Sequence, residues 1–184
     1  MSAIYQIWYD LPSPQVPTEE WLGLTTVEVT EGVATLVHND LVLRAWRHPA
    51  DPRLPGLPAA CDTDTVGAWL GAPVELEMLA YRPLRRAVLA ARGERPAFVK
   101  VLRPGKSTGL AQRQQLLHDA GIAPAVLAEP VPGVVVSAAA EGISLAQALV
   151  AWPDHPEQLP SAASLTALLD ALPAQTVRFP RRDS

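Results

Sequence analysis

Phe98-Val-Lys-Val-Leu102, inside the stretch Pro96–Lys106, places one lysine in the middle of an apolar run. Side chains alternate along a β-strand, so Lys100 is expected on the same face as Phe98 and Leu102. A lysine between two large apolar neighbours is costly to bury unless an anion meets its charge. The alternative is a lysine on an edge strand whose amine reaches water. The run therefore predicts a strand whose lysine either meets an anion or is structural.

The residues on either side predict a meander of strands, then a helix, then two more strands. Alternating apolar and polar residues precede a turn at Arg82-Pro-Leu-Arg85. Gly121 and Pro124 end the helix, and the linker Ala138-Ala-Ala-Glu-Gly142 follows the last strand. The predicted elements are, in order, strands at Val74–Tyr81, Arg86–Ala90 and Phe98–Leu102, a helix at Thr108–Ala120, and strands at Pro124–Ala128 and Val134–Ser137.

This order, with a lysine on the third strand of the meander, resembles the amino-terminal lobe of protein-kinase-like phosphotransferases. In particular, it resembles the aminoglycoside phosphotransferase and choline kinase family. The resemblance implies an α+β fold, namely a kinase-like small lobe with an antiparallel sheet of about five strands and one main helix, an amino-terminal β subdomain and carboxy-terminal helices. It covers about Leu41 to Leu172 and is carried by Tyr81–Leu89, Phe98–Lys106, Leu116–Pro124, Val134–Val136 and Gly142–Leu145.

The resemblance also implies the nucleotide-binding lobe of a small-molecule phosphotransferase, which moves the γ-phosphoryl group of ATP to a hydroxyl acceptor with Mg²⁺ as a second cofactor. Lys100 would contact the α- and β-phosphates, which suits a compact cationic group on a rigid strand. The helix of this family carries a Glu that orients the lysine. Gln112 is the best-placed residue here and is expected to face the sheet near Lys100. The implied ATP-binding residues are Lys100, Gln112, Arg85, Phe98, Ala138 and Ala139.

The sequence departs from the family pattern in two further places. Leu84 stands in the first hairpin turn, where the family branch has Gly. No His-Gly-Asp catalytic loop or later metal-binding Asp occurs; the nearest strings, His38-Asn-Asp40 and His118-Asp119, fall in a predicted hairpin turn and at a helix end. We therefore expect no catalytic residue and no Mg²⁺ ligand in this chain, an acceptor pocket in a missing large lobe, and no activity of the chain alone.

Composition excludes several other functions. The chain has 184 residues and a net charge of −4 with mixed signs, which does not favour nucleic acid or an acidic membrane as partner. A single cysteine, Cys61, excludes an internal disulfide and a cysteine-rich zinc site, and the four histidines lack ligand spacing. Neither a signal peptide nor an apolar segment of membrane-spanning length is found, so the expected location is cytoplasmic.

We expect three regions: a β-rich subdomain and crossing loop at 1–60, the small lobe at 61–142, and helices after the hinge with a disordered tail at 143–184. His48–Pro58 holds four prolines and a glycine, which predicts a loop without regular structure. Trp8, Trp21 and Trp46 predict a small β core; the alternative is a ligand-stacking platform. Strands are predicted at Ala3–Tyr9, Thr25–Thr30, Val33–His38 and Leu41–Arg47, and a helical turn at Thr18–Leu22.

Capping residues predict three more helices. Asp62 precedes a helix at Thr63–Leu70, and Ser144-Leu-Ala-Gln147 is a capping box for a helix at Leu145–Ala151. Ser161 precedes the last helix, which ends before Pro173. This helix has an apolar face through which the chain could self-associate, formed by Leu165, Leu168, Leu169 and Leu172.

Three interpretations follow. The first is the kinase-like small lobe, either part of a truncated phosphotransferase or a piece that needs a partner. The second is a non-enzymatic binding or interaction module that reuses the same scaffold, with Lys100 structural. The third is an unrelated α+β domain.

Overall fold

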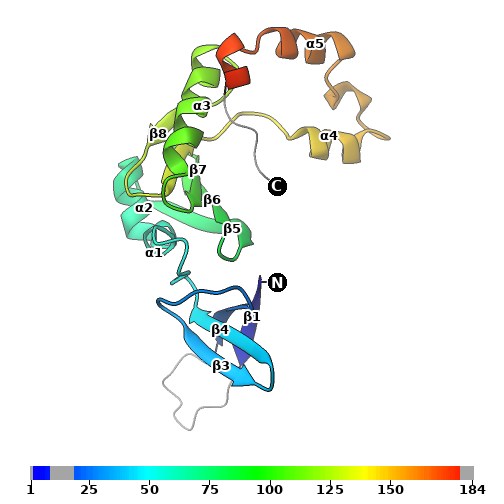
Figure 1. Ribbon diagram of the computed structural model, residues 1–184. Coiled ribbons are helices and arrows are strands. Elements are labelled where there is room, and N and C mark those ends of the chain that lie inside the picture. Colours follow the sequence, from blue (N-terminus) through cyan, green and yellow to red (C-terminus); the bar gives the residue numbers. More distant parts are fainter. Residues whose placement is uncertain (1, 9–18, 179–184) are drawn as a thin grey trace.

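A computed structural model describes the backbone of residues 2–8 and 19–178, and the side chains of residues 22–176. The fold is α+β, as expected, with two antiparallel sheets in the orders β1-β2-β4-β3 and β5-β6-β7-β9-β8. Figure 1 shows the amino-terminal sheet below the five-stranded sheet, α1 and α2 to one side, and the carboxy-terminal helices extending away above. No helix within the described ranges is both long and apolar enough to cross a membrane.

The amino-terminal sheet confirms most, but not all, of the predicted strands. The helical turn expected at Thr18–Leu22 and the strand expected at Thr25–Thr30 are wrong, because β2 occupies Glu19–Thr25 and pairs with both β1 and β4. A strand is specified by such distant partners, which a local pattern does not contain. The strands are β1 (Ser2–Trp8), β2 (Glu19–Thr25), β3 (Ala34–His38) and β4 (Leu41–Arg47).

Trp46 belongs to the core of this region. Its side chain is 3% exposed and lies against Gly23, where any Cβ would overlap the indole ring. Trp46 is therefore a packing residue, as the small β core predicts. The side chains of Trp8 and Trp21 lie outside the described residues, so the platform hypothesis stays untested for them.

The five-stranded sheet has the element order expected from the sequence, with the helix α3 between the third and fourth strands. Its strands are β5 (Val74–Arg82), β6 (Arg86–Gly93), β7 (Ala97–Leu102), β8 (Val126–Ala128) and β9 (Val134–Ala138), and α3 spans Ser107–Asp119. Central strand β7 pairs with β6 and β9. One face of the sheet, here the core face, is closed by the main hydrophobic core, to which it contributes Ala87, Leu89, Val99, Val101, Val134 and Val136.

The proline-rich crossing segment supplies the other side of that core. Leu54 and Leu57 are fully buried against the sheet. The expectation of no regular structure up to Pro58 is wrong at its end, because α1 spans Leu57–Ala60. Pro58 lies in the first turn of this helix, where backbone N–H groups have no partner within the helix and the missing N–H of proline costs no hydrogen bond. Helix α2 (Thr63–Leu70) is capped by Asp62 as predicted and packs on β5.

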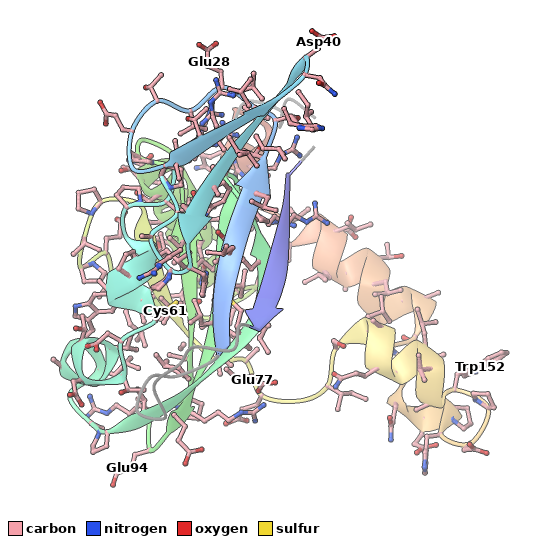
Figure 2. All side chains as sticks on the ribbon, turned by 90° about the horizontal axis from the view of Figure 1, so that it is seen from below. Glu28, Asp40, Cys61, Glu77, Glu94 and Trp152 are labelled. Carbon is pink, nitrogen blue, oxygen red and sulfur yellow. The ribbon has the colours of Figure 1, made fainter. Side chains whose placement is uncertain are left out.

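The carboxy-terminal arm, residues 143–178, extends away from both sheets (Figures 1 and 2), and Figure 2 shows Trp152 at its outer end. Its elements are α4 (Leu145–Ala151), η1 (Pro156–Gln158), α5 (Ala162–Asp170) and η2 (Ala174–Arg178). The capping box of Ser144 and Gln147 is present. The expected disorder of the tail is wrong as far as Arg178, because η2 extends to that residue. The predicted apolar face of α5 is exposed, with no buried residue in this helix.

Candidate functional site

Lys100 lies at the middle of β7, opposite Val88 of β6 and Val135 of β9. It alternates with the core residues Val99 and Val101, so it projects from the other face of the sheet, here the lysine face. Its Nζ donates one hydrogen bond, of 3.3 Å, to Oε1 of Gln114. No described carboxylate forms an ion pair with it. Burial lowers the pKa of the Lys100 amine because the charged form loses water.

The partner of Lys100 on α3 is Gln114, and the expectation of Gln112 is wrong. Gln112 is exposed, whereas Ser107, Ala111 and Gln114 form the buried side of the helix. These three residues are spaced at four and three positions, which keeps them on one helical face. The buried positions of this helix are small or polar residues and not its leucines. Gln114 is held in place because its Nε2 donates to the carbonyl oxygen of Pro124 at 3.1 Å.

One end of the five-stranded sheet is strongly basic. The β5–β6 turn and the β7–α3 loop meet at this end, because Arg82 pairs with Arg86 and Arg86 with Leu102. Between Leu79 and His118 the only acidic residue is Glu94, in the β6–β7 turn at the opposite end. Asp51 reaches this end, where its Oδ2 accepts a hydrogen bond from the Leu84 amide. The basic end, in a chain of net charge −4, comprises Arg82, Arg85, Arg86, Arg103 and Lys106.

The other expected ATP-binding residues spread along the sheet. Phe98 is half-buried on the lysine face, and Arg85 is exposed in the β5–β6 turn. Ala138 pairs with Ala97 at the end opposite the turn. The amides of Ala138 and Ala139 donate to the carbonyls of Ala125 and Pro96, at 2.9 and 3.0 Å. Either alanine could therefore meet a ligand only through its carbonyl or methyl group.

A polar cluster between the two sheets was missed by sequence reasoning. Asp51 is 3% exposed, and its Oδ2 accepts hydrogen bonds from the Tyr81 hydroxyl at 2.7 Å and the Leu84 amide at 2.8 Å. Its Oδ1 accepts from the Arg53 amide at 2.9 Å. The Tyr81 oxygen also accepts from Trp46 Nε1 at 3.4 Å. No local signal could reveal this cluster, because Asp51 sits in a proline-rich loop and Tyr81 and Leu84 lie 30 and 33 residues away from it.

Burial controls the protonation of this cluster. It raises the pKa of Tyr81, with the hydrogen bond to Asp51 acting in the same direction, so the phenol remains a donor. It lowers the pKa of His48, against a smaller opposing effect of Asp51. It also raises the pKa of the nearby Cys61 thiol to about 11, which leaves little reactive thiolate at neutral pH.

No family profile, curated protein or solved structure matches this chain. Among the residues that the structure describes, no group of three or more His, Cys, Asp or Glu side chains could hold a metal ion. The site is therefore characterised by its own geometry: a half-buried lysine with one neutral partner, beside a basic strand end.

Proposed function

We propose that this chain is the ATP-binding small lobe of a kinase-like small-molecule phosphotransferase. The observation that carries the proposal is the environment of Lys100. Its ammonium group sits half-buried on the central strand, and among the described side chains it is hydrogen-bonded only to the neutral Gln114. A buried charge without a counter-ion is costly, and a phosphate group would supply one. In kinases, a lysine on the third strand likewise meets a partner on the following helix, although that partner is a Glu.

The register of the sheet supports a nucleotide lying along the lysine face. Phe98 offers an apolar surface for a base on the side of Ala138, and Lys100 follows two residues further along β7. The basic end then lies where the later phosphates would extend. Phosphoryl transfer depends mostly on positioning and on neutralising charge, and these residues can contribute both.

The residues present do not fit a magnesium site. Mg²⁺ is held by carboxylates and phosphate oxygens, and the sequence from Leu79 to His118 supplies Glu94 alone, at the far end of the sheet. The contribution proposed for this chain is therefore nucleotide binding, without a catalytic step of its own.

A second candidate function is a non-enzymatic binding module on the same scaffold. The observation that favours it is Gln114, which satisfies Lys100 with a neutral oxygen in place of the Glu that the resemblance implies. In that case Lys100 would be structural, and the lysine face would have no specific affinity for ATP.

Calorimetric titration with ATP and Mg²⁺ tests the proposal. Wild type is expected to bind weakly, and Lys100→Ala to lose about tenfold or more in affinity, the usual effect of removing a charged hydrogen bond. Arg44→Ala is the matched control, because this cation lies on β4, in the amino-terminal sheet and away from the lysine face. Equal affinity of wild type and Lys100→Ala would reject the assigned role and favour the structural lysine.

The polypeptide alone is expected to show no phosphotransferase activity. Positioning by Lys100 cannot replace a catalytic base and metal ligands. An assay of ATP consumption with sugar or aminoglycoside hydroxyl acceptors measures this. Magnesium-dependent turnover well above the buffer rate, retained after repurification, would contradict the expectation.

A further inference from the structure

We infer that Asp51 is a positioning residue for the proposed nucleotide site, because it holds the β5–β6 turn from the face opposite Lys100. The inference rests on the proposed function and adds a residue from outside the small lobe. It also gives the amino-terminal sheet a role, since Asp51 and Trp46 both connect that region to β5.

The turn depends on Asp51 for its conformation. Leu84 has a φ of +63°, in the left-handed region that non-glycine residues seldom adopt, and its side chain is 3% exposed. Its amide donates to Asp51 Oδ2 at 2.8 Å. A charged acceptor bonded to this amide, together with burial of the leucine, holds a backbone conformation that would otherwise favour glycine.

Asp51 reaches the turn from the core face. Tyr81, which shares Asp51 Oδ2, packs against the hydrophobic core that contains Leu54 and Leu57. Lys100 projects from the other face. Asp51 therefore fixes the turn without entering the space in front of Lys100.

The contacts continue into the amino-terminal sheet. Trp46 of β4 donates its Nε1 hydrogen to the Tyr81 oxygen, and its indole packs on Gly23 of β2. A displacement of this sheet would thus act on Tyr81 and Asp51 before it reached Leu84. The turn and the amino-terminal sheet are expected to move together.

This arrangement changes how the turn can meet phosphate. The Leu84 amide is already bonded to a carboxylate, so it cannot also donate to a phosphate oxygen. Binding at the turn must then use the side chains of Arg82, Arg85 and Arg86. Exposed arginines give an affinity that falls as salt rises, because surface charges are screened.

The test uses the full chain and two measurements. Amide hydrogen exchange by NMR reports the Leu84 amide directly, and calorimetry reports ATP affinity. Asp51→Ala is expected to accelerate Leu84 exchange by about tenfold or more and to weaken ATP binding several-fold. Asp51→Asn retains one oxygen acceptor and should show smaller changes in the same direction. It replaces Asp51→Ala as the test variant if the alanine variant does not fold.

Asp62→Ala is the matched control. Asp62 also accepts a backbone amide, that of Thr65 at 2.7 Å, but it lies at the exposed start of α2. This variant should leave both Leu84 exchange and ATP affinity as in wild type. Wild-type Leu84 exchange in folded Asp51→Ala or Asp51→Asn would overturn the inference.

The two proposals can fail separately. If wild type binds ATP and Asp51→Ala binds it equally well, the positioning role is wrong and the proposed function stands. If wild type binds no ATP, the proposed function and the nucleotide part of the inference are both wrong, while the exchange measurement still decides whether Asp51 holds the turn.

Discussion

His48 lies beside the Tyr81 ring, with ring centroids 5.1 Å apart, and its Nδ1 is buried without a hydrogen-bond partner among the described residues. Loss of water favours the neutral imidazole and lowers the pKa of His48 in the folded chain. Asp51 acts against this effect from the same cluster. At the junction of the two sheets, burial therefore affects the pKa of His48 more strongly than the neighbouring Asp51 charge does.

This environment predicts a loss of stability in mild acid. The unfolded chain binds a proton at His48 near the ordinary pKa of 6.5, and the folded chain does so only at lower pH. The contribution of neutral His48 to the free energy of unfolding is therefore complete above about pH 6.5, and it is lost as the pH falls through the lowered pKa of the folded chain. His48→Phe should flatten the pH dependence of the urea midpoint in this window. His38→Phe, at an exposed strand end, is the control; equal slopes for wild type and His48→Phe would contradict the prediction.

At the level of elements, local patterns predicted those features that depend on neighbouring residues. The capping box at Ser144, the cap at Asp62 and the strand Leu41–Arg47 were all predicted correctly. Features that depend on distant partners were missed: β2 is fixed by pairing with two other strands, and Gln114 by the carbonyl of Pro124. The alternation of β7 predicted which face Lys100 occupies, but the sequence of α3 did not reveal that Gln114, and not Gln112, meets it.

The crossing segment is predicted to be an essential part of the core. Leu57 of α1 is fully buried, so Leu57→Ala should lower the free energy of unfolding by about 2–5 kcal/mol. Leu169→Ala on α5, where the leucine is 65% exposed, should change it by less than about 0.5 kcal/mol. Urea denaturation of both variants checks this contrast. A reversed order would mean that α5, and not α1, belongs to the core.

At the level of the whole molecule, the two sheets meet through the cluster around Asp51, and the carboxy-terminal arm remains apart from both (Figure 1). Among the described side chains, several apolar residues of this arm are exposed. Burying one leucine fully contributes about 1.5–3 kcal/mol, so covering this face would stabilise an assembly appreciably. Leu165, Leu168 and Leu169 of α5 are 41%, 47% and 65% exposed, and Leu172, just after the helix, is 40% exposed.

The chain is therefore predicted to self-associate through α5, or to leave this helix mobile and prone to non-specific association. Light scattering at several concentrations should show a mass that rises with concentration for wild type. Leu165→Glu and Leu169→Glu should lower it without unfolding the chain. A strictly monomeric, protease-resistant wild type whose glutamate variants unfold would instead place α5 in the core.

The most direct test of the nucleotide-binding proposal is the pKa of Lys100, measured by NMR of the ¹³Cε atoms of labelled lysine. Lys100 and Lys106 are the only lysines in the sequence, so two signals are expected, and Lys106→Arg assigns them. In the free chain the Lys100 midpoint should lie below the ordinary lysine value, because burial lowers its pKa. Saturating ATP should raise the Lys100 midpoint, since a phosphate favours the charged amine. A Lys100 midpoint that ATP leaves unchanged would contradict the proposal that this lysine binds the nucleotide.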